Sequence, residues 1–327
     1  MAIGNITARK RGFGYDPVTR SLGVYTDGAL TASFPPSPGR TYFVNNITGS
    51  SSNDGLSWAN AMDEPSTAIT ASETYRELGG VEGGSAVTTN DYVRNTIIVQ
   101  GTGTTYTYLS ALPSYCNVIG LGATPFGDGT GIVVIGDATG TADGIAGSSR
   151  GLYMTNMQFV GAGSYYGADF AVLYRSTIED CAFGSNASSA AAAVALNIVS
   201  GSGVVIRRCR TIGHAATPVI GFQFASAGGN FNECLVEDCT MMASTTGFSA
   251  AGYLQNNTWI RNNVAYGGTT GISDTSAETT IYGNSFYTNN FGSGGTTGMT
   301  VSQNAGYRAV MNVSNSAATI AIYYAYG

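Results

Sequence analysis

The chain has 327 residues and a formal net charge of −6, and it contains 46 glycines but only 10% charged residues. Its length allows a large continuous core, while its acidity argues against nucleic acid as a partner. No apolar window of about 18 residues predicts a membrane span, and the N-terminus lacks the apolar core of a secretory signal.

Residues 1–40 lie outside any repeat and predict an N-terminal arm. The arm begins with a small basic cluster and closes with the Pro-rich run 34–39, which predicts a stiff spacer. Its aromatic content exceeds that of most disordered tails, so an extended arm that docks on another subunit is favoured over a disordered leader. We expect attachment through seven of its residues: Arg9, Lys10, Arg11, Phe13, Tyr15, Tyr25 and Phe34.

Residues 41–95 predict a cap at the start of the folded part. An aromatic strand over 41–45 precedes a Gly/Ser/Asn-rich turn, and a helix follows with Ser66 as its N-cap and Gly79-Gly80 at its end. This combination resembles the opening of right-handed parallel β-helix proteins of the pectin-lyase-like superfamily. The resemblance implies that strand and helix plug one end of a coil, where unpaired backbone and core would otherwise be open.

Residues 96–327 carry a repeated phrase. Each copy is a branched apolar residue, two mostly polar residues and then Cys or Asn, and six copies begin at Ile178, Ile206, Val236, Ile260, Ile281 and Val301. Their final positions lie 20–30 residues apart, which is a period typical of a solenoid. Looser copies over 152–156, 133–136, 117–120 and 98–101 extend the pattern towards the N-terminus.

The residue types of the phrase predict its local structure. Branched residues favour strand, and a Gly or Asn at the final position favours a kink with positive φ. Strand, kink, strand and loop, repeated over about ten coils, predict a single right-handed parallel β-helix.

The final positions of the phrase form a Cys/Asn column: Cys181, Cys209, Cys239, Asn263, Asn284 and Asn304. We expect these residues to stack inside one corner of successive coils, because free cysteine packs as a small apolar residue. Five cysteines, an odd number, do not predict a disulfide framework. A metal site is the alternative, but His214 is the only histidine and no CxxC pair occurs. We therefore predict neither a metal nor another cofactor.

Charged residues alternate at equivalent positions of four successive copies: Glu179, Arg207, Glu237 and Arg261. Neighbouring strands of a sheet lie about 4.8 Å apart, so this alternation predicts a structural ladder of opposite charges. The alternative is the groove of a polysaccharide lyase or hydrolase, in which a glycosidase needs two carboxylates roughly 5–10 Å apart. Arg207 lies between Glu179 and Glu237, so no catalytic residue is predicted.

The widest spacings predict loops over 161–167, 184–193 and 214–230. Four aromatic residues in these loops are candidates for a binding face: Tyr165, Tyr166, Phe222 and Phe224. They would stack on sugar rings or pack against another protein, and the alternative is that they cover their own coil. The last run, 319–327, alternates like a strand, and it either contacts another copy or protein or packs back on the last coil.

A Gly/Ser/Thr/Asn-rich rod behind a short arm resembles bacteriophage surface proteins, whose N-terminus anchors and whose β-helix projects. The resemblance implies a non-enzymatic, trimeric structural protein of the virus particle, made in the host cytoplasm and located on the virion surface. It would be a capsid decoration (cement) protein, or a head-fibre or spike component that contacts the major capsid protein or a tail component. The main alternative is a tailspike or lyase that binds or cleaves a surface glycan, and a bacterial adhesin is the third.

Overall fold

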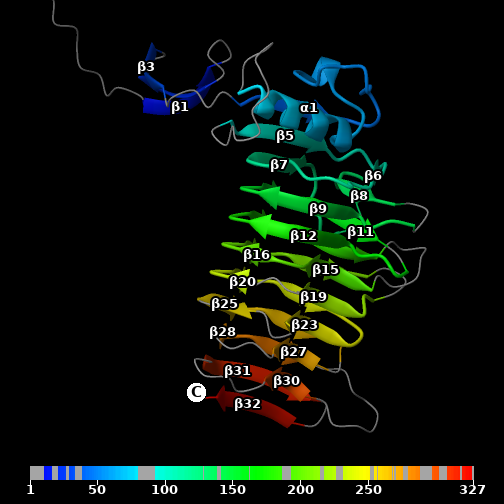
Figure 1. Cartoon of the computed structure of the whole chain (residues 1–327), viewed down its shortest axis with the longest axis vertical. Helices are drawn as coiled ribbons and strands as arrows, with labels where there is room; N and C mark the ends of the chain where they lie inside the picture. The colour runs from blue at the N-terminus through cyan, green and yellow to red at the C-terminus, as the bar shows by residue number, and fades with distance from the viewer. Residues whose placement is uncertain are drawn as a thin grey trace, which may run out of the picture.

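The computed structural model describes residues 11–16, 21–26, 29–33, 39–79, 93–127, 129–137, 141–161, 163–185, 193–213, 217–225, 231–250, 254–255, 257–266, 268, 270–274, 279–287, 297–301, 308–316 and 319–325. Within these ranges the chain is a parallel β-helix, as the repeated phrase predicts, with one α-helix at its first end (Figure 1). Six residues singled out in the sequence lie outside the described ranges: Arg9, Lys10, Phe34, Gly80, His214 and Asn304.

Three ladders of parallel strands form the walls of the rod. Within the described ranges the first ladder has ten strands: β4 (Thr41–Val44), β5 (Asn95–Gln100), β7 (Cys116–Leu121), β10 (Tyr153–Thr155), β13 (Thr177–Glu179), β17 (Val205–Arg207), β21 (Leu235–Glu237), β25 (Thr258–Arg261), β28 (Thr279–Tyr282) and β31 (Arg308–Ser316). The second ladder ends on the same β31 and contains β6 (Tyr106–Thr107), β8 (Val134–Gly136), β11 (Gln158–Gly161), β14 (Ala182–Ser185), β18 (Arg210–Ile212), β22 (Thr240–Met242), β26 (Val264–Tyr266) and β29 (Ser285–Tyr287).

The third ladder was not expected from the sequence. It stacks down the rod in Figure 1 as β9 (Ile145–Arg150), β12 (Ala168–Tyr174), β15 (Val194–Ile198), β19 (Ile220–Phe224), β23 (Thr246–Ala250), β27 (Thr270–Asp274) and β30 (Thr297–Val301). Short strands beside it are β16 (Gly201–Ser202), β20 (Phe231–Asn232) and β24 (Leu254–Gln255). Each of these coils therefore has a third wall where the sequence predicts a loop.

A residue in left-handed conformation separates the first two strands in six successive coils, from Asn156 to Gly283. The φ angles are 50° at Asp180, 51° at Arg208, 54° at Asp238 and 54° at Asn262, in a region that Asp and Asn tolerate better than most side chains. The kink therefore falls one residue before the Cys/Asn position, not on it. The copy at 152–156 is correspondingly shifted, because Asn156 has φ 58° and Met157 takes the level of Cys181.

The core fills the space between the three ladders. The branched residue of each phrase points inwards and is fully buried at Ile178, Ile206, Val236, Ile260 and Ile281. Aromatic rings supply the opposite wall, where Phe224 stacks on Phe231 with a centroid distance of 4.6 Å and meets Phe248 edge-on at 5.4 Å. Apolar burial of this kind is the main stabilising contribution in a fold with so few charged residues.

The first end of the rod is closed by β4, a short 3₁₀ turn η1 (Trp58–Asn60) and the helix α1 (Pro65–Glu77). Ala68 and Ile69 on α1 are buried, and the helix ends before Gly79, whose φ is +71°. Pro65 occupies the first helical turn and Glu64 is the N-cap, so the predicted N-cap at Ser66 is wrong by two residues. In the described residues no helix is long and apolar enough to cross a membrane.

The N-terminal strands form a sheet of their own, whereas the C-terminal strand joins the rod. Strands β1 (Arg11–Asp16), β2 (Ser21–Thr26) and β3 (Ala29–Ser33) form a separate antiparallel sheet, which lies beside the end covered by α1 (Figure 1). The predicted arm is thus a small sheet over 11–33 instead of one extended segment. At the other end, β32 (Thr319–Ala325) pairs antiparallel with β31, so the last run packs back on the last coil.

Candidate functional site

The four alternating charges lie level with one another on the first ladder. Glu179 is in register with Arg207, Arg207 with Glu237, and Glu237 with Arg261. The ion pairs, however, do not continue along the whole ladder but join its charges two by two. Arg207 pairs with Glu179, and Arg261 pairs with Glu237 at 2.7 Å.

Glu179 is the most enclosed carboxylate of this ladder. It accepts hydrogen bonds from the Tyr153 hydroxyl and from Arg207, and Arg208 lies 3.0 Å away while also pairing with Asp180 at 2.7 Å. Burial alone would raise the pKa of Glu179, but these hydrogen bonds and the two guanidinium charges outweigh it and lower the pKa. A carboxylate held ionised in this way is a poor general acid, so Glu179 does not suit the acid role of a glycosidase.

The described members of the Cys/Asn column are all buried, from Cys181 at one end to Asn284 at the other. Asn263 accepts from the Cys239 backbone amide at 2.9 Å and donates to the Val236 carbonyl at 3.0 Å, and Asn284 repeats the pattern one coil later. Burial raises the thiol pKa of Cys181 and Cys239, which suppresses thiolate chemistry. The asparagines of the column therefore satisfy the hydrogen bonding of backbone amides and carbonyls at the corner of the coil.

The four aromatic candidates divide into two pairs. Phe222 and Phe224 lie on β19 and are fully buried, so the prediction that they line a loop surface is wrong. The segment 220–224 alternates apolar and small or polar residues, which is the period of a strand. Tyr165 and Tyr166 do lie in a connection between β11 and β12, and both are half-buried.

Two carboxylates that the sequence analysis did not single out lie beside Tyr166. Asp143 accepts a hydrogen bond from the Tyr166 backbone amide at 2.7 Å, and Asp169 projects from β12. Burial raises the pKa of Asp143. The hydrogen bond from the Tyr166 amide lowers this pKa and the charge of Asp169 raises it, so the net shift is upwards. Burial also raises the pKa of the Tyr166 phenol, with further contributions from the charges of Asp169 and Asp143. In the described part of the chain, neither carboxylate forms an ion pair.

Asn197 completes this group on the next coil. It lies level with Asp169, is 5% exposed, and donates from Nδ2 to Asp169 Oδ1 at 2.7 Å. Its Oδ1 atom is shielded from solvent, and no group of the described chain donates a hydrogen bond to it. We call Asp143, Tyr165, Tyr166, Asp169 and Asn197 the tyrosine–aspartate site.

One sequence signal pointed to this site. Asp169 and Asn197 are 28 residues apart, which is also the spacing of Cys181 and Cys209. Equal spacing places each pair at the same level of successive coils, so a polar pair with that spacing marks neighbours on one face. Asp143 offers no such signal, because its contact depends on how the chain turns at Tyr166.

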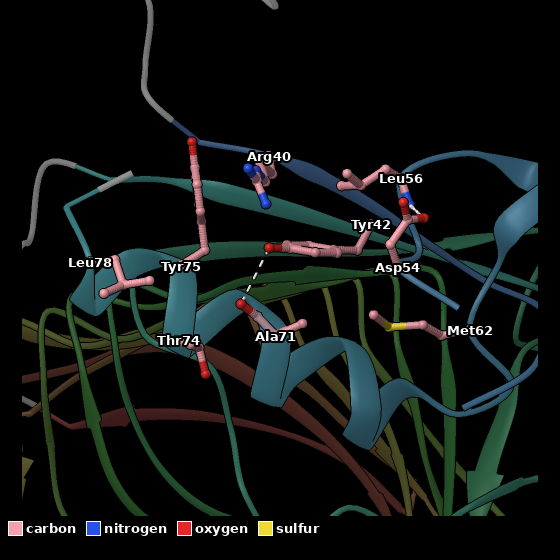
Figure 2. Close-up of a pocket in the computed structure, with 9 residues that line it drawn as sticks. All are labelled: Arg40, Tyr42, Asp54, Leu56, Met62, Ala71, Thr74, Tyr75 and Leu78. Atoms are coloured by element: carbon pink, nitrogen blue, oxygen red, sulfur yellow. Dashed lines mark hydrogen bonds between the residues drawn. The ribbon is translucent and has the colours of Figure 1, made fainter. Parts of the chain in front are cut away.

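A separate hollow of about 420 Å³ lies where α1 meets the first strand. Figure 2 shows Arg40 beside Tyr75, with its guanidinium carbon 3.9 Å from the ring centroid, and the Tyr42 hydroxyl donating to the Ala71 carbonyl at 3.2 Å. Burial raises the pKa of Tyr42, and the nearby Arg40 only partly offsets it. Leu56, Met62 and Leu78 complete apolar walls, Asp54 also lines the hollow, and the hollow is the seam between the cap helix and the first strand.

Comparison with known proteins assigns no family. The sequence matches no protein-family model and no curated protein. Among solved structures it is similar to the GH136 lacto-N-biosidase from Eubacterium ramulus, as the selenomethionine derivative (9% identity, 82% of this chain and 67% of that chain, TM-score 0.35) and as the native protein (9% identity, 81% and 68%, TM-score 0.29). Similarity at this level carries no information about substrate, and it does not place the chain in the pectin-lyase-like superfamily.

Proposed function

We propose that this protein is a carbohydrate-binding β-helix, which binds a hydroxyl-rich ligand at the tyrosine–aspartate site. The observation that supports the proposal is the pair of half-buried carboxylates, Asp143 and Asp169, with no cationic partner in the described residues and two tyrosines alongside. Carboxylates accept hydrogen bonds from sugar hydroxyls, and tyrosine offers an apolar ring with a polar tip. Small-ligand sites usually combine apolar and aromatic surface with a few precisely placed polar groups.

The charge ladder does not support the same function. Its carboxylates are already occupied by Arg207, Arg208 and Arg261. A glycan that used Glu179 would first have to displace these partners, which costs the energy of a hydrogen-bonded ion pair. The carbohydrate hypothesis therefore moves from the first ladder to the edge of the third.

The experiment is a glycan array on the purified protein, followed by titration calorimetry with any ligand found. Asp169→Asn and Tyr165→Ala should weaken binding, whereas Asp180→Asn, a carboxylate neutralised by Arg208, should leave it unchanged. A reducing-sugar assay on the same samples separates binding from cleavage. Array binding that survives Asp169→Asn and Tyr165→Ala unchanged would contradict the proposed site.

A role in a virus particle is the second candidate, and the separate sheet β1–β3 is the observation that favours it. This sheet pairs with no strand of the rod in the described residues, and a sheet of three strands needs an apolar face or a packing partner for stability of its own. We propose that it attaches the rod to a larger assembly such as a capsid. A chain beginning at Thr41 should fold with the same cap yet fail to join the assembly, with a loss far larger than that caused by Tyr165→Ala. Full occupancy by the shortened chain would refute this attachment.

A further inference from the structure

We propose that the outer face of the first ladder binds a second copy of this chain, packed antiparallel about a two-fold axis that runs along the strands between β17 and β21. This surface lies on a different wall of the rod from the tyrosine–aspartate site, so the proposal goes beyond glycan binding. Two columns of level side chains on this surface carry the argument. The charge column is Glu179, Arg207, Glu237 and Arg261, and the apolar column is Val205, Leu235 and Trp259.

The apolar column lies on the outside of the rod. Its three residues are level with one another and alternate with buried branched residues, so they point away from the core. Val205 and Leu235 are half-buried, and Trp259 is 42% exposed. Contiguous apolar side chains that are flanked by polar ones are typical of protein interaction surfaces.

The order of the charges selects the partner. Along the rod the charge column reads acid, base, acid, base, so the same column read from its other end has the opposite sign at every level. A second copy turned over about the two-fold axis therefore places Arg261 opposite Glu179 and Glu237 opposite Arg207. Each contact occurs twice, because a two-fold interface uses the same surface on both copies. Complementary charge of this kind fixes the register of an interface.

The ion pairs within each copy add to this match. The Glu179–Arg207 pair of one copy lies over the Arg261–Glu237 pair of the other, so that each charge meets the opposite sign. Both hydrogen bonds that Glu237 accepts from Arg261 end on Oε2, and within the described residues no group donates to its Oε1 atom. Arg207 bonds to Glu179 through Nε, and its side chain is 40% exposed. The Nη groups of Arg207 can therefore donate to Oε1 of Glu237 in the second copy.

The residues at the kink continue the pattern. Arg208 and Asp238 directly follow the two central residues of the charge column, so they face each other across the same axis. The Arg208 side chain is 46% exposed. Asp238 is exposed as well, and it forms no ion pair in the part of its own chain that the structure describes. Arg208 of the second copy supplies the cation for this acid.

The direction of the axis follows from the two columns. An axis along the strands sets each column against the same column of the second copy, with Val205 opposite Leu235. An axis along the rod would instead set the charges against the apolar column, which removes water from them without supplying an opposite charge. The axis along the strands falls between the sixth and seventh of the ten described strands of the first ladder, so the two rods overlap along most of their length.

The width of the surface limits its affinity. A contact made by two columns should bury less than the roughly 800 Å² per partner of a standard interface. Complexes of that standard size have dissociation constants that begin at about micromolar and run downwards. We therefore expect a weaker dimer, with a dissociation constant of roughly 10⁻⁵–10⁻³ M.

The test uses the full chain over a concentration series that spans this range. Sedimentation equilibrium gives the mass, and small-angle X-ray scattering gives the shape, which should be wider than the monomer but hardly longer. Arg207→Glu and Glu237→Arg should each weaken self-association roughly tenfold or more, because like charges then face each other. An equimolar mixture of these two variants should restore association, since every acid then faces an arginine. The double variant, whose net charge equals that of the parent, should also associate with itself.

Two further variants complete the design. Arg150→Glu is the matched control for net charge, because Arg150 lies on β9, away from both columns, and it should leave association unchanged. Trp259→Ser changes no charge and should weaken the dimer through the apolar column, which keeps the test valid if a ladder variant does not fold.

Three results would overturn the proposal. Protein that stays monomeric at millimolar concentration has no such interface. Self-association that Arg207→Glu and Trp259→Ser both leave unchanged uses another face. Association that the mixture of Arg207→Glu with Glu237→Arg does not restore shows that these two positions do not lie opposite each other.

Discussion

Arg207 binds back to Glu179 on the preceding coil and leaves Glu237, its level neighbour on the following coil, to Arg261. Arg207 thus lies between two acids and stabilises the stack on both sides, by contact on one and by proximity on the other. The arginine side chains of both pairs are 40% exposed, so solvent screens each pair and its contribution is on the order of 0–1 kcal/mol.

Arg207→Glu should place three like charges on consecutive coils. We expect a lower melting temperature, by the equivalent of roughly 1 kcal/mol or more, with the larger part at low salt because repulsion between exposed charges is screened. Thermal unfolding at two ionic strengths measures it. Arg150→Glu is the control, because this exposed arginine lies outside the charge ladder, over the Tyr174 ring. Unchanged stability together with loss of glycan binding would instead identify the ladder as a binding groove.

Glu179 should make the protein sensitive to acid. Its folded pKa is lowered from an ordinary value of 4.5, so its contribution to stability is complete above that value and is lost as pH falls through the folded pKa. Denaturant unfolding between pH 7 and pH 3 should show a decline below about pH 4.5 that is shallower in Glu179→Gln. The variant should also be less stable than the parent at pH 7. Parallel curves for the two proteins would contradict this assignment.

Cys209 tests the interior of the column. Its thiol is fully buried and lies 3.6 Å from the Ile178 carbonyl and 3.4 Å from the Arg207 carbonyl, so a serine hydroxyl can keep these contacts. Cys209→Ser should therefore cost little, whereas Cys209→Arg should cost several kcal/mol because it buries an unpaired charge. Chemical denaturation measures both, and a Cys209→Arg protein as stable as the parent would show that the column faces solvent.

Phe224 tests the third wall. Its ring is fully buried between Phe231 and Phe248, so Phe224→Ala should cost about 3–5 kcal/mol. Tyr165→Ala, at a half-buried position, should cost much less. The same denaturation experiment compares them. Equal and small effects would mean that the segment 220–224 is a loop after all.

How much of this architecture could be predicted depended on which strands repeat their residue types. The first ladder repeats a branched residue at Ile178, Ile206 and Val236, and the kink beside it recurs, so fold and charge register were both visible in the sequence. The third ladder also carries a signature, in which Gly221, Gly247, Gly271 and Gly298 each precede a large apolar residue on level strands, but it was not recognised in the sequence. The level positions Val194, Ile220 and Thr246 are 26 residues apart, so the spacing of this ladder was also visible in the sequence.

Prediction of the site was limited by contacts between coils. Tyr165 and Tyr166 were identified as surface candidates from the length of their connection. Their polar neighbours come from three coils, and a contact such as that of the Tyr166 amide with Asp143 depends on the path of the backbone between strands. Asn197 looks like any strand residue in sequence, and only its level with Asp169 gives it significance.

Because the ladder charges pair two by two, the removal of one coil and the removal of two coils should have different effects on stability. A deletion that joins Asp180 to Cys209 removes one coil and brings Glu179 level with Glu237, so that two carboxylates face each other. A deletion that joins Asp180 to Cys239 removes two coils and brings Glu179 level with Arg261, which restores opposite charges. The length of this solenoid is therefore easier to change by an even number of coils than by an odd one.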